Sequence, residues 1–115
     1  MAEPYVRAGN VKWIAKGSDV GVQERTLEPG QEIPWHYHTI IADNTYCLEG
    51  TVQIELLGPE ERMLLSPGQN YAIQMHRPHR ITAHGARPCR FLLIQGVGQY
   101  DRHPIKPEEW QARHG

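Results

Sequence analysis

Short runs of alternating apolar and polar residues repeat along this chain. In TVQIELL (51–57), the apolar residues Val52, Ile54 and Leu56 alternate with polar ones. A period of two residues is the pattern of a β-strand that buries one face. DVGVQERTL (19–27) alternates in the same way. Both segments are therefore predicted to be strands.

Further segments of similar length are rich in β-branched, aromatic or aliphatic residues, which strands favour. They are NTYCLEG (44–50), RMLLS (62–66), NYAIQM (70–75), HRITA (79–83) and RFLLIQGV (90–97). The chain contains nine prolines and 11 glycines, and motifs such as EPGQ and SPGQ between the segments predict turns. Many short strands separated by turns indicate an all-β sandwich or barrel.

Helical periodicity is absent before residue 104. In KPEEWQARHG (106–115), Pro107 is followed by two acidic residues, which suits the first turn of a helix. We expect one short helical turn there. A length of 115 residues is ordinary for one domain, so residues 1–115 are predicted to form a single all-β domain.

The charge balance narrows the possible partners. Twelve basic and 13 acidic residues give a formal net charge of -1, without the basic patch that a nucleic-acid partner would require. No apolar run is long enough to span a membrane, and the N-terminal residues show no export signal. We therefore expect a soluble, cytoplasmic protein. Cys47 and Cys89 form no C-x-x-C motif and are expected to be reduced and buried.

The segment PWHYHTIIAD (34–43) carries the strongest chemical signal. On a strand, His36 and His38 would project from one face about 6–7 Å apart. Two imidazoles so placed can bind one ion at about 2.0–2.1 Å each. Pro34 and the turn before it predict the start of this strand. The spacing alone leaves two interpretations open, namely a metal site that includes Asp43 or exposed rings on an edge strand.

The longer segment PGQEIPWHYHTIIADNTYCLEG (29–50) resembles the first signature of the cupin superfamily. That signature consists of glycine, His-x-His, glutamate and glycine at fixed intervals. Its positions fall on Gly30, His36, His38, Asp43 and Gly50, and every interval fits. Aspartate in place of glutamate is the one departure.

The second cupin signature matches residues 68–83 in part. Gly68 and His79 occupy the expected positions. Gln74, His76 and Ala83 stand where the signature has proline, glycine and asparagine. The segment still has the expected character, with a Pro-Gly turn, a short strand and then a Pro-His pair that enters the next strand.

The resemblance implies a small double-stranded β-helix, or jelly-roll barrel, whose ligands point inward. His36, His38 and His79 would bind one divalent first-row transition-metal ion per chain: iron, manganese, nickel, copper or zinc. Asp43 would be a fourth ligand or a neighbour acting through water. Its side chain is about 1.5 Å shorter than glutamate, which favours the second arrangement.

Two more residues near these signatures are candidates for the pocket. The ring of His76 could enter the mouth of the barrel as an acid/base group, or it could be an exposed loop residue. If Asp43 faces inward, alternation places Thr45 and Cys47 on the same face. For Cys47 we expect the role of a small buried core residue.

The leading functional hypothesis is a metal-dependent enzyme of dioxygenase, isomerase or cyclase type, acting on a small organic molecule in the barrel. The alternative is a metal- or ligand-binding protein without turnover, such as a sensor or carrier. RFLLIQGV (90–97) is apolar on both alternating faces, more than one buried face requires. Together with the dimers that the resemblance to cupins implies, this predicts a homodimer.

Overall fold

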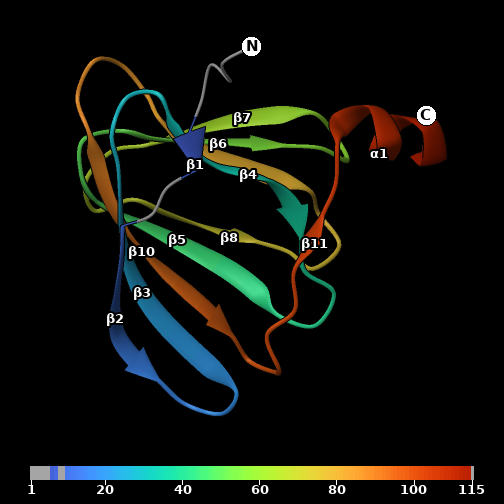
Figure 1. Cartoon of the computed structure of the whole chain (residues 1–115), viewed down its shortest axis with the longest axis horizontal. Coiled ribbons are helices and arrows are strands. Elements are labelled where there is room, and N and C mark those ends of the chain that lie inside the picture. The colour runs from blue at the N-terminus through green and yellow to red at the C-terminus, as the bar shows by residue number, and fades with distance from the viewer. Residues whose placement is uncertain (1–5, 8–9, 115) are drawn as a thin grey trace.

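The computed structural model describes residues 6–7 and 10–114, and its strands form two facing sheets (Figure 1). One sheet has the order β1–β4–β9–β6–β7, with β11 also pairing with β4, and the other has the order β2–β3–β10–β5–β8. The elements are β1 (Val6–Arg7), β2 (Val11–Lys16), β3 (Val20–Leu27), β4 (Gln31–Tyr37), β5 (Ala42–Glu49), β6 (Val52–Leu56), β7 (Glu61–Leu65), β8 (Asn70–Ile73), β9 (His79–Ala83), β10 (Cys89–Gly96), β11 (His103–Pro104) and α1 (Pro107–His114).

The chain passes repeatedly from one sheet to the other. Strands β3, β5, β8 and β10 lie in one sheet, whereas β4, β6, β7 and β9 lie in the other. This winding is the predicted double-stranded β-helix, and every strand expected from alternation is present. The single domain over 1–115 stays a prediction, and residues 1–5, 8–9 and 115 lie outside the described residues.

The sequence analysis missed β2, which pairs with β3 at the edge of its sheet. All six of its residues are exposed, so no buried face imposes an alternating pattern. A register shift between Trp13 and Ala15 further breaks the period of two. Edge strands of this kind leave little trace in a hydrophobic pattern.

The short helical turn expected near the C-terminus is a helix of eight residues, α1. Pro107 is its first residue, as predicted, and Glu108 and Glu109 lie in its first turn. The backbone N–H of Lys106 donates to the Glu109 carboxylate at 3.1 Å, which satisfies one donor that the helix leaves free. None of its residues is buried, so α1 lies outside the barrel (Figure 1).

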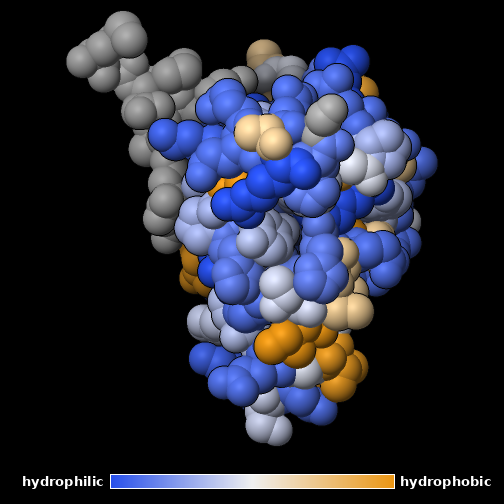
Figure 2. Space-filling view, turned by 90° about the vertical axis from the view of Figure 1, so that its right-hand side faces the viewer, coloured by the Kyte–Doolittle hydropathy of each residue, from blue (hydrophilic) through white to orange (hydrophobic). Residues whose placement is uncertain are grey.

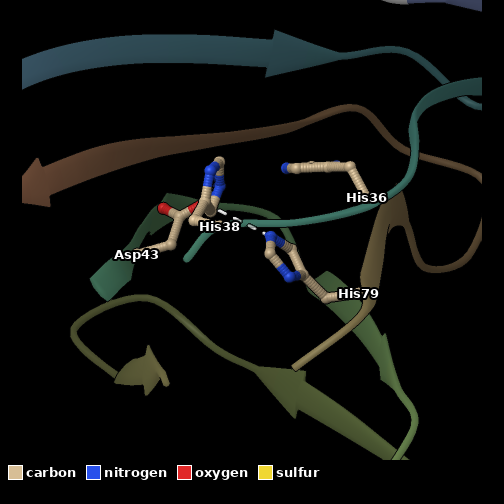
Figure 3. Close-up of side chains that lie close together, drawn as sticks. All are labelled: His36, His38, Asp43 and His79. Carbon is tan, nitrogen blue, oxygen red and sulfur yellow. Dashed lines mark hydrogen bonds and ion pairs between the residues drawn. The ribbon is translucent and has the colours of Figure 1, made fainter. Parts of the chain in front are cut away.

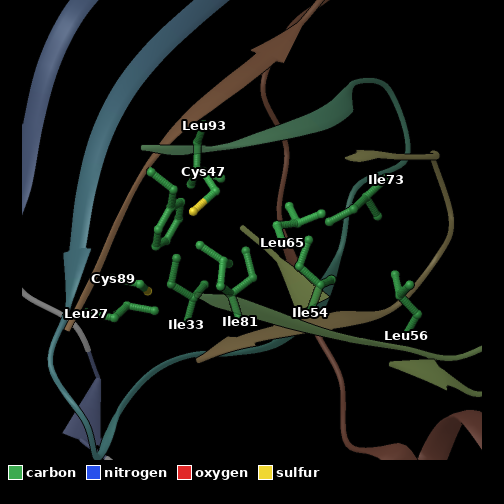
Figure 4. Close-up of a cluster of buried hydrophobic side chains, with 12 residues drawn as sticks. Leu27, Ile33, Cys47, Ile54, Leu56, Leu65, Ile73, Ile81, Cys89 and Leu93 are labelled. Atoms are coloured by element: carbon green, nitrogen blue, oxygen red, sulfur yellow. The ribbon is translucent and has the colours of Figure 1, made fainter. Parts of the chain in front are cut away.

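Apolar side chains from both sheets meet between them and form the core (Figure 4). The alternation predicted for β6 is confirmed, because its first, third and fifth residues are buried. Cys47 and Cys89 are free thiols within this cluster, as expected. Burial and the neighbouring Cys47 raise the pKa of the Cys89 thiol to about 12, so it stays protonated at neutral pH.

Backbone conformation explains the glycines of the first signature. Gly30 and Gly50 have φ angles of 89° and 71°, in the left-handed region that favours glycine. A Cβ atom at Gly50 would also lie 2.4 Å from the carbonyl oxygen of Pro88. The turn after β5 therefore requires glycine on two independent grounds.

The face of the molecule shown in Figure 2 is largely hydrophilic, with apolar side chains gathered in one small region. Exposed apolar residues include Ile40 and Val97, which are 48% and 76% exposed. Within the described part of the chain, α1 is far too short and polar to cross a membrane, and no other helix is present.

Candidate metal centre

Four polar side chains meet in the interior between the two sheets (Figure 3). His36 comes from β4, His79 begins β9, and these two residues are cross-strand partners. Asp43 reaches them from β5 in the facing sheet, and His38 follows the end of β4. All four are at least 97% buried. The structure thus brings together all the ligands that the signatures predicted.

A bulge in β4 turns His36 inward. The register against β9 shifts between Ile33 and His36, which are three residues apart and yet are both buried. Pro34 lies inside the bulge, where its missing N–H breaks no pairing. The prediction that Pro34 begins the strand is wrong, because β4 begins at Gln31. Strict alternation would have placed Ile33 and His36 on opposite faces.

Each imidazole is oriented by a backbone carbonyl. His36 Nδ1 lies 2.7 Å from the carbonyl oxygen of Pro34, and His79 Nδ1 lies 3.0 Å from that of Arg77. His38 Nδ1 makes the same kind of contact with the carbonyl of Asp101. When Nδ1 donates its hydrogen, the lone pair is on Nε2, which is the form that binds metals.

The donor atoms have the spacing that one ion requires. Candidate ligand atoms of the four residues all lie within 4.8 Å of one another. Asp43 Oδ2 is 3.2 Å from His38 Nε2 and 3.3 Å from His79 Nε2. Two donors that bind one ion at about 2.0–2.2 Å each lie about 3.0–3.5 Å apart. The Asp43 carboxylate is therefore close enough for direct ligation, despite its shorter side chain.

Charges in the centre are mutually dependent. Burial, with a further contribution from His79, lowers the pKa of His36 to about 3, so this imidazole is neutral at pH 7. Burial opposes ionisation of Asp43, but the imidazoles of His38 and His79 outweigh it and hold the pKa of Asp43 below its usual range. Burial likewise opposes a charge on His38, but Asp43 outweighs it and raises the pKa of His38. The carboxylate thus favours a positive charge beside it, which a divalent cation supplies.

Two buried atoms of the centre lack hydrogen-bond partners among the described residues. They are Asp43 Oδ1 and His79 Nε2. His79 Nε2 has only the 3.3 Å contact with Asp43 Oδ2, whose geometry is not that of a hydrogen bond. Buried polar atoms are normally satisfied, because leaving one unpaired costs about 1–3 kcal/mol. A metal ion bound by the four residues would satisfy His79 Nε2. The residues present therefore fit the metal that the sequence predicted.

Asp101 supports the centre, and no motif in the sequence marked it. Its carboxylate accepts hydrogen bonds from the backbone N–H groups of Thr39 and Ile40, and from the hydroxyl of Thr39. His103 contacts the same carboxylate at 2.7 Å. Asp101 is 63 residues from His38 in sequence, so only the fold reveals that it holds the segment after β4.

His76 does not join the cluster. It is exposed, and it lines a separate hollow near α1 together with Tyr37 and Trp110. Its φ angle of 66° explains why the second signature has glycine at this position. Its backbone N–H donates to the carbonyl of His38 at 2.6 Å, so its main chain still supports the centre. An acid/base role for its ring stays a prediction.

The centre opens into two adjoining hollows. The inner one has a volume of about 70 Å³, and its walls include His36 and Asp43 together with Ile33, Ile81 and Leu93. The outer one has a volume of about 300 Å³. Its walls include Trp13 and Lys16, and it shares three residues with the inner hollow: Gln23, Gln95 and Tyr100.

Comparison with known proteins agrees with this architecture. The family model described as "Cupin domain" matches residues 23–95. No curated protein sequence matches the chain. Among solved structures, an uncharacterized conserved protein with a double-stranded β-helix domain from Klebsiella pneumoniae is 22% identical, with a TM-score of 0.73 over 89% of this chain and 92% of that one.

Two further structures are similar. A protein from Thermus thermophilus is 25% identical, with a TM-score of 0.70, covering 76% of this chain and 82% of that chain. A cupin-2 domain containing protein from Shewanella frigidimarina is 24% identical, with a TM-score of 0.65 and corresponding coverages of 77% and 81%. Likeness at this level concerns the fold and says nothing of a reaction.

Proposed function

Since this chain belongs to the cupin domain family, we propose that it is a metal-dependent enzyme of dioxygenase, isomerase or cyclase type that acts on a small organic molecule. One observation carries the proposal. Four buried donor residues, His36, His38, Asp43 and His79, meet at one place, and two of them, His36 and Asp43, line a hollow that adjoins a larger one. A structural metal site is usually closed, whereas a catalytic site keeps a position open to substrate.

The residues of the chain have separable tasks in this proposal. The three imidazoles and Asp43 hold a divalent first-row transition metal. When bound, such an ion polarises a carbonyl or enolate oxygen or activates dioxygen. Ile33, Ile81 and Leu93 add apolar surface to the otherwise polar walls of the inner hollow, and its volume of about 70 Å³ limits the water around a bound molecule, which strengthens electrostatic interactions there.

The openness of the pocket favours an enzyme over a sensor or carrier. A protein that only holds a metal could fill the space above the ion with side chains. Here the inner hollow adjoins the larger outer one, and the two share Gln23, Gln95 and Tyr100 as lining residues. Space for a small molecule therefore remains beside His36 and Asp43.

The test begins with elemental analysis of protein purified without added metal. We expect about one transition-metal ion per chain, removed by chelator and restored by adding the same metal. Oxygen uptake is then measured with catechols, β-diketones and keto acids, and isomerisation of keto acids by proton NMR. Absence of metal, with no uptake of iron, manganese, nickel, copper or zinc, would contradict the proposal. Metal binding without turnover of any compound would favour the sensor or carrier.

We also propose that the protein is a homodimer. Strand β2 is an exposed edge, with Trp13 and Ile14 48% and 51% exposed. On β10, Leu92 and Ile94 lie on the outer face of the same sheet and are only half-buried. Edges and apolar sheet faces of this kind favour pairing with another copy. Sedimentation that shows only a 13.2 kDa species at micromolar concentration would refute the dimer.

A further inference from the structure

Two arginines line the inner hollow beside the metal centre. Arg25 lies on β3, in register with the inward-facing Phe91 of β10, and Arg102 follows β10. Both residues line this hollow together with His36 and Asp43. The charge of Arg25 beside a hollow of about 70 Å³ requires an explanation, because a cation removed from water is costly unless it is paired.

Arg25 has no carboxylate partner among the described residues. Its Nη1 donates a hydrogen bond to the side-chain oxygen of Gln23 at 3.3 Å, and its Nε is buried without a hydrogen-bond partner among the described residues. Burial is also the largest cause of a lowered pKa for Arg25. By contrast, Arg80 pairs with Glu32 and Glu55 at 2.7 and 2.6 Å. The chain thus pairs a guanidinium on the sheet surface and leaves unpaired one that faces the centre.

Asp43 forms no ion pair with Arg25. It is the one carboxylate among the residues that line the inner hollow. Its Oδ2 atom is engaged with His38 and His79 at 3.2 and 3.3 Å. A divalent ion at the four donors would offset its negative charge and add to the positive charge of the walls. The hollow is therefore suited to an anion.

The outer hollow indicates what the anion is attached to. Its volume of about 300 Å³ lies at the lower end of the range for small-molecule pockets. The Trp13 ring lies against Gly21 on its wall, and Tyr100 lies between the two hollows. Lys16 also lines this hollow, with its Nζ atom 4.7 Å from the centre of the Trp13 ring, so the walls combine aromatic surface with a positive charge. Aromatic surface of this kind favours an organic body over a free inorganic ion.

We infer that the substrate is a small organic carboxylate, whose carboxylate group is bound by Arg25 while its body extends toward Trp13. A guanidinium matches a carboxylate with two parallel hydrogen bonds, and Arg25 lines the inner hollow without a carboxylate partner among the described residues. Arg102 adds positive charge to the same hollow. The inference rests on the proposed function, because it places the carboxylate beside the metal on which that function depends.

The experiment compares benzoate with benzamide, which has nearly the same shape and no charge. Both are titrated calorimetrically into the full chain loaded with zinc, which has no redox chemistry. We expect benzoate to bind at least tenfold more tightly than benzamide. Arg25→Gln should abolish that preference, and Arg25→Lys, which keeps the charge, should restore part of it. Arg87→Gln removes one exposed charge from the turn between β9 and β10 and should change neither affinity.

The outcomes separate this inference from the proposed function. Equal binding of the two probes, a preference that survives Arg25→Gln, or no binding of either probe at millimolar concentration would overturn the inference. Metal content is measured on every sample, and both probes are also titrated into the metal-free chain. Failure to take up metal overturns the proposed function, whereas an Arg25-dependent preference in the metal-free chain would still support the anion site. Circular dichroism establishes that each variant is folded.

Discussion

The same four strands build two regions of the interior that differ in chemistry. From β4, β5 and β9, Ile33, Cys47 and Ile81 enter the apolar core, while His36, Asp43 and His79 from those strands enter the metal centre. Strand β10 likewise contributes Phe91 to the core, and its Gln95 lines the hollow beside the centre. Both regions lie between the same pair of sheets.

The two regions are held by different interactions. A core residue stabilises the fold through apolar area removed from water, about 1.5–3 kcal/mol for a large side chain, and many packings serve equally well. An imidazole in the centre acts through the direction of one nitrogen, fixed by a carbonyl on the other side of its ring. Stability and metal affinity should therefore respond to different substitutions.

The largest effect is expected from Phe91→Ala in the core. Phe91 is fully buried, and its truncation should lower the free energy of unfolding by about 3–5 kcal/mol through lost transfer energy and a cavity. Urea denaturation followed by circular dichroism measures the change. Zinc uptake per folded molecule should stay near the wild-type value. A stable variant that has lost its metal would show that the two regions are not separable.

Next comes His79→Ala in the centre, with His36→Ala and His38→Ala as companions. Each should weaken metal affinity more than 100-fold, beyond the range typical of outer partners, because a ligand itself is lost. The sheet should survive, since the core does not require the ion as a zinc finger does. Competition with a chelator measures affinity. His76→Ala is the control, and metal loss there with full retention in His79→Ala would contradict our alignment of the second signature.

Asp43→Ala should approach the effect of losing a histidine. The carboxylate lies 3.2 and 3.3 Å from two ring nitrogens, the separation expected of donors that share one ion. The same competition assay applies. A loss of only about 10–100-fold would place Asp43 outside the ligand set, acting through water. An unchanged affinity would remove it from the centre.

A smaller loss is expected from Asp101→Asn. This change weakens the hydrogen bonds that hold Thr39 and Ile40, and so loosens the segment that carries His38. We expect affinity to fall about 10–100-fold, as for other groups that orient a ligand. Asp19→Asn, an exposed carboxylate in the turn before β3, serves as the control. Equal affinities in the two variants would remove Asp101 from the support of the centre.

The smallest effect tests the border between the regions. Ile81 belongs to the core and also lines the inner hollow. Ile81→Val should cost about 0.5–1.5 kcal/mol of stability, because it removes one methylene without changing shape greatly. Metal affinity should stay within twofold of wild type. A larger change in affinity than in stability would mean that apolar packing sets the positions of the ligands.

Much of this architecture could be predicted from the sequence, because it depends on local patterns. Alternation predicted the strands that have one buried face, and fixed intervals predicted His36, His38, Asp43 and His79 as a group. The second signature could be recognised although His76 replaces its glycine. The structure is compatible with this replacement, because histidine is one of the few residues other than glycine that adopt the left-handed backbone found there. Local sequence and global fold agree at these positions.

The rest depends on contacts between distant residues. No pattern in the sequence predicts the bulge at Pro34, which places Ile33 and His36 on the same face of the strand. Asp101 lies in the segment between β10 and β11, where no sequence motif marks it. Its role is visible only because the fold brings this segment to the end of β4. Alternation predicts that Arg25 lies on a strand, but it does not predict that this charged residue lines the hollow beside the centre. Such features follow from topology rather than from composition or spacing.

The contact between His38 and the carbonyl of Asp101 has a consequence for the order of synthesis. All four donor residues leave the ribosome before β10, which lies between β3 and β5, and before Asp101. A nascent chain that has not reached β10 therefore carries all four donor residues. It lacks the strand that pairs with both β3 and β5, and it lacks the carbonyl that orients His38. The four donors can therefore reach the arrangement described above only after this segment has been translated.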